Sequence, residues 1–451
     1  MSVALRRIRQ VPLPIRRSET DACPGALRLH QAADGPLARI RLPGGRLTGT
    51  QLAALASIAA DSGDGSLELT SRANVQLRAL TRTNPTDLAA RLSAAGLLPA
   101  PTHETVRNIA APPLADARTR ALIHDLDAAL CADPELTALP GRFLFAIGPV
   151  PLATDVAAVA VGAAPADEFA ILFAGHDEGL RVPADRVTAA LLAAAHAFLD
   201  ARAHHKSAIT TPDTADRPAA GATPVVGTGK LAWRLAELPG GARVIAELTA
   251  ARLGAALRDE QGLVPDYPAS PVGVLPQSDG LVAVGAIVPL GRLTGVQMKV
   301  LAEADHLVMT PWRGVVVADL PPSAVSAWQR RLAEAGLPTG PDSRWTGVTA
   351  CAGLPGCAKS RADIRADALA ATRFVDGLPV HWLGCERGCG SPAGPHVRVE
   401  ATPDGYAITT PDGQVVVATA ITPHPPTAAG HPSAAGFDAG LADLVAAARR
   451  S

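Results

Sequence analysis

The chain has 451 residues, 48% of them hydrophobic but only 3% aromatic, and a formal net charge of −1. This length suits about two to four domains, whose cores must consist of Ala, Val, Leu and Ile side chains. The balanced charge argues against binding of nucleic acid through bulk electrostatics. No apolar run reaches the length of a membrane span, and Met1–Arg9 lacks the apolar stretch of a secretory signal, so we expect a cytoplasmic protein without membrane partners.

The first elements alternate between strand and helix. A strand is predicted at Ala38–Leu42, and a helix follows Thr48, whose hydroxyl is a good N-cap. A second strand is predicted at Leu67–Leu80, and a second helix is expected to end at Gly96. The first helix would bury one apolar face, made of Leu52, Leu55, Ala56 and Ala59.

The strand at Leu67–Leu80 carries a polar face. Its alternation predicts that four polar side chains point to one side: Arg72, Asn74, Gln76 and Arg78. Two arginines flanking two amides without an acid favour a site for a planar polyanion, because arginine binds carboxylates through paired hydrogen bonds. Arg39 and Arg41 likewise share a face of the preceding strand, for which a merely solvated face is the alternative.

The middle of the chain contains an apolar strand near Val156–Pro165 and a linker candidate at Ser207–Gly229, which is rich in Thr, Pro, Gly and Ala. After it, the sequence repeats itself. Gly45–Gln51 recurs as Gly291–Gln297, and Arg91–Leu97 recurs as Arg331–Leu337 at a smaller offset, which predicts a shorter loop in the second copy.

The second copy has the same predicted order of elements as the first. A strand at Leu281–Val288 precedes a helix after Thr294, a strand at Leu307–Ala318 and a helix that ends at Gly336. Strand–helix–strand–helix units with short turns predict a pair of ferredoxin-like α+β half-domains. The polar face is absent from the second copy, where Val315–Val317 replaces it.

Four of the six cysteines lie close together near the C-terminus, in glycine- and proline-rich loops. Cys351 and Cys357 form a C-x5-C pair, and Cys385 and Cys389 form a C-x3-C pair. Four thiolates from two loops are typical of an iron–sulfur cluster, whereas C-x5-C fits a structural zinc site poorly. Zinc, a disulfide and four buried unligated thiols are the alternatives. By the repeat, Cys351 aligns with Ala111, so these loops exist only in the second half.

The remaining cysteines, Cys23 and Cys131, are isolated, and each is interpreted as a small buried hydrophobe.

The cysteine pairs and the duplicated units resemble the sirohaem sulfite and nitrite reductase superfamily over about residues 22–417. Within it, the chain is most similar to the precorrin-3B synthases of aerobic cobalamin biosynthesis. Besides the cysteines, the resemblance rests on Ala22–Ala26, Asp34–Arg41, Thr70–Leu77, Val106–Ile109 and Trp233–Leu238.

The resemblance implies an α+β, duplicated nitrite/sulfite reductase-like architecture with pseudo-two-fold symmetry. Two ferredoxin-like half-domains would occupy residues 18–100 and 230–340, with a linker at 207–229. A reductase-like α/β domain without a cluster would occupy residues 101–206, and residues 341–451 would form the domain that binds the cluster.

The resemblance also implies roles for residues. Cys351, Cys357, Cys385 and Cys389 would ligate a [4Fe–4S] cluster, and in a sirohaem reductase the last of them would bridge to haem iron. The arginines implied in catalysis are Arg72, Arg107 and Arg142. Those implied in binding substrate carboxylates, with the two amides, are Arg39, Arg41, Arg72, Asn74, Gln76, Arg78 and Arg107.

One departure from the reductase pattern bears on the reaction. The reductases carry two active-site lysines after a Leu-Pro, where this chain has Arg142 and Leu144. Reduction of sulfite needs a dense cationic, proton-donating pocket. The departure therefore favours the synthase over the alternative, a sirohaem-dependent sulfite or nitrite reductase, in which sirohaem would be bound.

The synthase resemblance implies an oxidoreductase that takes precorrin-3A, O2 and a reductant, hydroxylates C-20 and closes a γ-lactone from the ring A acetate. It also implies a mononuclear non-haem iron, for which the sequence assigns no ligands. Without a Gly-x-Gly-x-x-Gly fingerprint after a strand, we expect electrons from an external donor or reductase.

Overall fold

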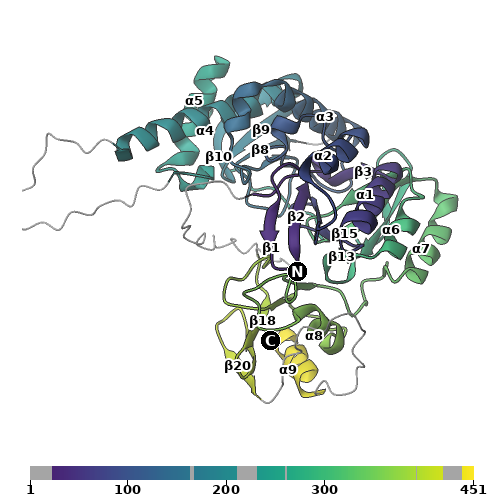
Figure 1. Cartoon of the computed structure of the whole chain (residues 1–451). Coiled ribbons are helices and arrows are strands. Elements are labelled where there is room, and N and C mark those ends of the chain that lie inside the picture. Colours follow the sequence, from purple (N-terminus) through teal and green to yellow (C-terminus); the bar gives the residue numbers. More distant parts are fainter. Residues whose placement is uncertain are drawn as a thin grey trace, which may run out of the picture.

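The computed structural model describes residues 23–162, 167–210, 231–259, 262–392, 394–419 and 439–450. Within these residues the strands form four five-stranded sheets, covered by helices (Figure 1). Two sheets belong to the duplicated half-domains and two to flanking α/β domains. The duplicated α+β architecture predicted from the sequence is confirmed.

The first half-domain contains an antiparallel sheet and two helices. In spatial order its own strands are β1 (His30–Ala32), β2 (Gly35–Ile40), β5 (Val75–Leu77) and β4 (Leu67–Leu69). The helices are α1 (Gly49–Ser62) and α2 (Pro85–Ala94). As predicted, Thr48 caps α1: its hydroxyl accepts from Gln51 N at 3.2 Å, and Gln51 Oε1 accepts from Thr48 N at 2.9 Å.

The strand predicted at Leu67–Leu80 is instead a hairpin. A turn at residues 70–74 separates β4 from β5, because Ala73 adopts a left-handed φ of 58° and the Thr70 hydroxyl accepts from Asn74 N at 3.1 Å. The second copy turns in the same way: Arg313 has a φ of 58°, and Thr310 Oγ1 accepts from Gly314 N at 3.0 Å. The continuous alternation expected along residues 72–78 is therefore broken.

The second half-domain repeats this plan. Its own strands are β11 (Gly273–Pro276), β12 (Val282–Ile287), β15 (Gly314–Leu320) and β14 (His306–Met309), again antiparallel, and its helices are α6 (Gly295–Leu301) and α7 (Val325–Glu334). Thr294 caps α6 as Thr48 caps α1. The predicted shorter loop was wrong, since the helix itself is shortened, from 14 residues in α1 to 7 in α6.

The half-domains exchange one short strand each. β3 (Arg46–Thr48) comes from the first half but pairs with β14, and β13 (Arg292–Leu293) comes from the second half but pairs with β4. Both pairings are antiparallel and complete a five-stranded sheet. The buried leucines of the exchanged strands, Leu47 and Leu293, belong to one hydrophobic core that both halves share.

The first flanking domain contains β6 (Ile109–Ala110), β7 (Phe145–Ile147), β8 (Val156–Val161), β9 (Glu168–Phe173) and β10 (His176–Pro183) in that spatial order. The pairs β6–β7 and β7–β8 are parallel, whereas β9 pairs antiparallel with both β8 and β10. Its helices are α3 (Ala117–Ala132), α4 (Val187–Thr210) and α5 (Gly241–Leu253).

The boundary predicted at residue 230 needs correction. Residues 232–257, including α5, pack into the core of the first flanking domain rather than into the second half-domain, because their apolar side chains lie against α4 and β10. The linker predicted at 207–229 begins with the last residues of α4, and its remainder lies outside the described residues.

The second flanking domain has the same strand order and directions as the first. Its strands are β16 (Val348–Ala350), β17 (Val380–Leu383), β18 (Val397–Thr402), β19 (Gly405–Thr409) and β20 (Val415–Thr419), and its helices are α8 (Ile364–Ala371) and α9 (Ala439–Arg450). The pseudo-symmetry therefore extends to the flanking domains. In Figure 1 the β1–β2 hairpin points toward this domain.

Short 3-10 helices connect several elements: η1 (Pro43–Gly45), η2 (Pro101–His103), η3 (Pro134–Ala138), η4 (Ala184–Arg186), η5 (Leu235–Glu237), η6 (Pro289–Gly291) and η7 (Pro322–Ala324). None of the helices in the described ranges combines the length and apolar composition that a bilayer crossing requires.

Gly49, the first residue of α1, lies where the two half-domains are in contact, so its substitution tests this contact. A Cβ on Gly49 would lie 2.2 Å from Ala304 O, whereas the nearest such atom at the equivalent Gly295 is Gly65 O at 3.9 Å. Gly49→Ala should therefore lower the free energy of unfolding by about 1–3 kcal/mol through overpacking, measured by urea denaturation. Gly295→Ala is the matched control and should cost nothing. Equal effects of the two substitutions would contradict the proposed close contact.

Candidate functional site

The cysteine loops follow two adjacent parallel strands. Cys351 comes directly after β16, and Cys385 comes two residues after β17. Because the carboxyl ends of parallel strands meet at one edge of a sheet, both loops lie at the same edge. Gly384, just ahead of Cys385, donates its N–H to Cys351 Sγ at 3.3 Å, which ties the loops together.

The charges of neighbouring cysteines raise the pKa values of Cys389 and Cys351. Burial raises the pKa of Cys389, and the charges of Cys385 and Cys357 raise it further. Burial likewise raises the pKa of Cys351, to which the charge of Cys389 contributes. None of the four cysteines forms a disulfide in this structure.

The donor chemistry of these loops fits a cluster. Thiolate ligands need compensating positive charge. The guanidinium groups of Arg365 and Arg387 offset part of the rise in pKa that burial causes at Cys351 and Cys389, respectively. Among the described residues, no three His, Cys, Asp or Glu side chains form a group that could hold a metal ion. The ligation of a [4Fe–4S] cluster by the four cysteines therefore stays a prediction.

Histidine ligands for a mononuclear iron stay unassigned. His103 is buried with its ring nitrogens bonded to Thr102 Oγ1 and Asp133 O. In His381, Nδ1 is 2.7 Å from Thr349 Oγ1 and Nε2 is 3.0 Å from Cys389 O. Burial lowers the pKa of His381 to about 3, so this neutral ring supports the second cysteine loop.

The first half brings several of the predicted arginines together. Burial, followed by the charge of Arg39, lowers the pKa of Arg41 to about 9. Burial, followed by the charge of Arg234, lowers the pKa of Arg72 to about 10. Guanidinium groups that lower one another's pKa form a site that an anion would stabilise. Arg234, which sequence reasoning did not single out as a site residue, joins this group beside Asp155, 2.7 Å away.

The individual arginines are held differently. Arg72 lies in the turn between β4 and β5, and its Nη1 donates to Arg142 O at 3.1 Å. Arg39 donates to Gln76 Oε1 from Nε at 3.1 Å and from Nη2 at 2.6 Å. Arg41 donates to backbone carbonyls, while its buried Nε has no hydrogen-bond partner within the described part of the chain.

Other predicted site residues are engaged inside the protein. Arg107 pairs with Asp127 through two hydrogen bonds of 2.7 and 2.6 Å. Asn74 is buried, and its Oδ1 accepts from Leu42 N at 2.8 Å. These contacts give both side chains a role in packing, and their predicted roles in binding stay untested.

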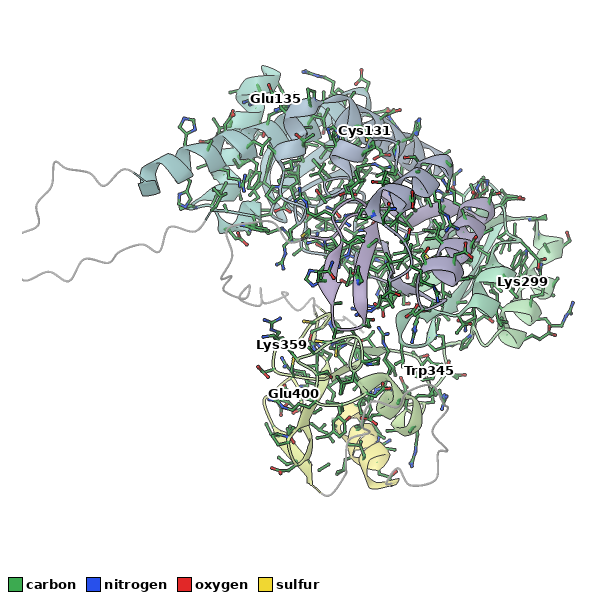
Figure 2. All side chains as sticks on the ribbon, viewed as in Figure 1. Cys131, Glu135, Lys299, Trp345, Lys359 and Glu400 are labelled. Atoms are coloured by element: carbon green, nitrogen blue, oxygen red, sulfur yellow. The ribbon has the colours of Figure 1, made fainter. Side chains whose placement is uncertain are left out.

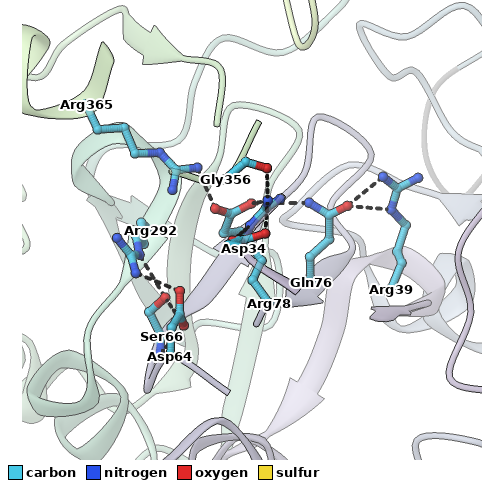
Figure 3. Close-up of polar contacts among 10 residues, drawn as sticks. Asp34, Arg39, Asp64, Ser66, Gln76, Arg78, Arg292, Gly356 and Arg365 are labelled. Carbon is cyan, nitrogen blue, oxygen red and sulfur yellow. Dashed lines mark hydrogen bonds and ion pairs between the residues drawn. The ribbon is translucent and has the colours of Figure 1, made fainter. Parts of the chain in front are cut away.

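Arg78 reaches the loop that carries Cys357. It pairs with Asp34, lies 3.7 Å from Glu68 and donates to Gly356 O (Figure 3). Sequence reasoning missed Glu68 and its other partner, Arg365 of α8, 2.5 Å away. A lone acid within an apolar strand was the available signal, because such an acid usually needs a cationic partner.

Arg142 and Leu144, which follow the Leu-Pro, differ from each other in exposure. Arg142 is exposed, whereas Leu144 is 2% exposed and packs in an apolar cluster with Ala146 and Val150. A cavity of about 480 Å³ lies nearby, lined in part by Arg28, Thr102 and Trp233. None of the predicted site residues lines it.

Parts of the chain match known proteins. Residues 30–95 and 275–335 match the family described as the nitrite/sulfite reductase ferredoxin-like half domain. A ferredoxin–nitrite reductase of Synechococcus elongatus is 40% identical over 123 residues, which are 25% of this chain and 24% of that protein. The chain thus matches about a quarter of the length of this curated relative.

One solved structure resembles a larger part of the chain. The NirA protein of Mycobacterium tuberculosis superposes with a TM-score of 0.61 at 20% identity, covering 83% of this chain and 74% of that chain. The fold is therefore that of NirA. Sequence similarity to nitrite/sulfite reductases is found in the two matched half-domains and in the 123 residues aligned with the nitrite reductase.

The arginine group predicts stabilisation by anions. A polycarboxylate such as citrate should raise the midpoint of thermal unfolding by on the order of a few degrees, because it relieves repulsion among Arg39, Arg41 and Arg72. Arg72→Met should reduce this rise. Arg91→Met, which removes an exposed ion pair with Asp61 in the same half-domain, should not. Equal responses of the two variants would contradict an anion site at Arg72.

Proposed function

We propose that this chain is an iron–sulfur oxidoreductase that acts on a carboxylate-bearing tetrapyrrole. The proposal rests on the different side chains of the two halves. Four cysteines lie at one sheet edge of the second half, and arginines that repel one another lie together in the first half. The cluster, held by Cys351, Cys357, Cys385 and Cys389, would supply one-electron transfer. The arginines would bind the acetate and propionate groups of the macrocycle.

Among tetrapyrrole reactions, we favour that of precorrin-3B synthase: O2-dependent hydroxylation of precorrin-3A at C-20 with γ-lactone formation. One oxygen atom would enter the macrocycle and the other would leave as water, with electrons from an external donor. Leu144 supports this choice, because a buried leucine offers no proton where the reductases carry a lysine. Arg142 is a poor replacement as an acid, since an exposed guanidinium holds its proton tightly.

In this proposal the chain's own residues bind and orient the substrate. Arg72 is fixed by its bond to Arg142 O and would present its remaining donors to a carboxylate. Arg39, aligned by Gln76, would bind a second carboxylate on the same side. Fixing two carboxylates at the rim of a planar ring determines which ring edge faces the reacting centre.

A sirohaem-dependent nitrite or sulfite reductase is the second candidate. The relatives favour it over the synthase, since one is named a ferredoxin–nitrite reductase and the structural neighbour is NirA. In that reaction the tetrapyrrole would be a resident group rather than the substrate, and Cys389 would help to hold the cluster that supplies electrons to it. A ferredoxin-like electron donor would suit either candidate.

The four cysteines can be tested one by one. Serine at any of positions 351, 357, 385 or 389 should lower iron and acid-labile sulfide to a small fraction of the wild-type content after anaerobic purification. Cys131→Ser is the control, because Figure 2 places Cys131 on α3, far from Lys359 beside the loops. Zinc without sulfide in the wild-type protein would contradict the cluster.

Absorption spectra separate the two candidates. The synthase proposal predicts an iron–sulfur spectrum without a Soret band, and turnover of precorrin-3A that requires O2. A Soret band with extractable sirohaem, together with reduction of nitrite or sulfite, would contradict the synthase and support the reductase. The measurement needs only anaerobically purified protein, because it detects haem and cluster together.

A further inference from the structure

Each cysteine loop accepts a hydrogen bond from an arginine of a different half-domain. Gly356 precedes Cys357, and its carbonyl oxygen accepts from Arg78 Nη2 at 2.7 Å. Gly390 follows Cys389, and its carbonyl oxygen accepts from Arg313 Nη2 at 2.7 Å. The first arginine belongs to the first half-domain and the second to the second half-domain.

Both contacts depend on glycine in the loop. A Cβ on Gly356 would lie 2.8 Å from Arg78 Nη2, and a Cβ on Gly390 would lie 2.8 Å from Arg313 Nη2. Any other residue at either position would push the guanidinium away from the carbonyl oxygen that it binds. At each cysteine loop, the contact with the arginine therefore requires the glycine.

Arg78 is fixed firmly enough to act as an anchor. Its Nε and Nη2 donate to the two carboxylate oxygens of Asp34 at 2.8 and 2.9 Å, and its side chain is only 7% exposed. Glu68 joins it to Arg365 of the cysteine-bearing domain (Figure 3). A bidentate pair in this buried setting holds the guanidinium in one orientation.

Arg313 is held by backbone and packing. It adopts a φ of 58°, which is unfavourable for a residue with a side chain, and its aliphatic stem lies over Gly291. In the first half the equivalent turn residue is Ala73, with the same φ of 58°. The repeat places Ala318 at the position equivalent to Arg78. The two arginines thus occupy different positions of the repeat, yet both reach the cysteine loops.

We propose that Arg78 and Arg313 are positioning residues, each of which fixes one cysteine pair so that the four thiols lie where a cluster can form. The inference rests on the cluster proposed above. The arginines touch loop carbonyls rather than substrate or cluster atoms, so they act through the loops. They also connect the cysteine loops mechanically to both half-domains.

The experiment compares Arg78→Met and Arg313→Met with one control in each half-domain. The controls are Arg91→Met, which removes a pair with Asp61, and Arg331→Met, which removes a pair with Glu303; both arginines lie on helices of the half-domains. Amide hydrogen exchange is measured on anaerobic protein and on protein stripped of metal. The electron paramagnetic resonance spectrum of the reduced protein is recorded in parallel.

Each variant should loosen its own loop. Arg78→Met should speed exchange at residues 351–357, and Arg313→Met at 385–391, on the order of 10-fold, the size expected from one charge-assisted hydrogen bond. The same variants should broaden the resonance of the reduced cluster. Arg313→Lys retains a charge and a donor, so it should restore part of the wild-type line shape. The controls should change neither readout.

Unchanged exchange in both loops, or equal changes in the control variants, would overturn the proposal. If Arg78→Met does not fold, Gly356→Ala, which places a Cβ 2.8 Å from Arg78 Nη2, displaces the guanidinium without removing the arginine, and the same loop should loosen. Wild-type protein with zinc and without sulfide would refute the cluster but not the anchoring, because exchange in the metal-free protein tests the loops separately.

Discussion

The exchange of two short strands between the half-domains determines the rest of the structure. β3 completes the sheet of the second half, and β13 completes the sheet of the first. Main-chain hydrogen bonds fix the register of both pairings, and the leucines of these strands enter one common core. The half-domains therefore cannot rotate independently, and an arginine of each, Arg78 in the first and Arg313 in the second, contacts the domain that carries the cysteines.

A single scaffold used twice carries different chemistry in its two copies. The flanking sheets share strand order and direction, but only the second has cysteines after its first two strands. The arginines of the first half repel one another, and a bound anion would relieve this repulsion. Arg78 and Arg313 then link the copies, because each reaches from a half-domain to a cysteine loop.

Local signals in the sequence predict much of this fold. The repeated Gly-Arg-Leu-Thr-Gly segment marks both helix starts correctly, because Thr48 and Thr294 form capping boxes with a glutamine three residues on. The exchange was not predictable, since strands of two or three residues carry no periodicity. The turn at Thr70 was also hidden, because alanine at position 73 gives no sign of a left-handed backbone.

The candidate site was predictable in kind but not in arrangement. Cysteine spacing identifies the loops, whereas the partners of each arginine depend on tertiary contacts. Arg107 meets an acid 20 residues away in the chain, Asp127, and Arg78 meets a loop 278 residues away. No pattern along the strand distinguishes an arginine that binds a ligand from one that binds a neighbouring loop.

The most direct test of the central claim is a crystal structure of the anaerobically loaded protein with a carboxylate-bearing tetrapyrrole. The account predicts a four-iron cluster on the four cysteines and the macrocycle beside it, with carboxylates paired to Arg72 and Arg39. A macrocycle bound away from these arginines, or a single metal ion on the cysteines, would contradict the claim that the two halves serve one ligand.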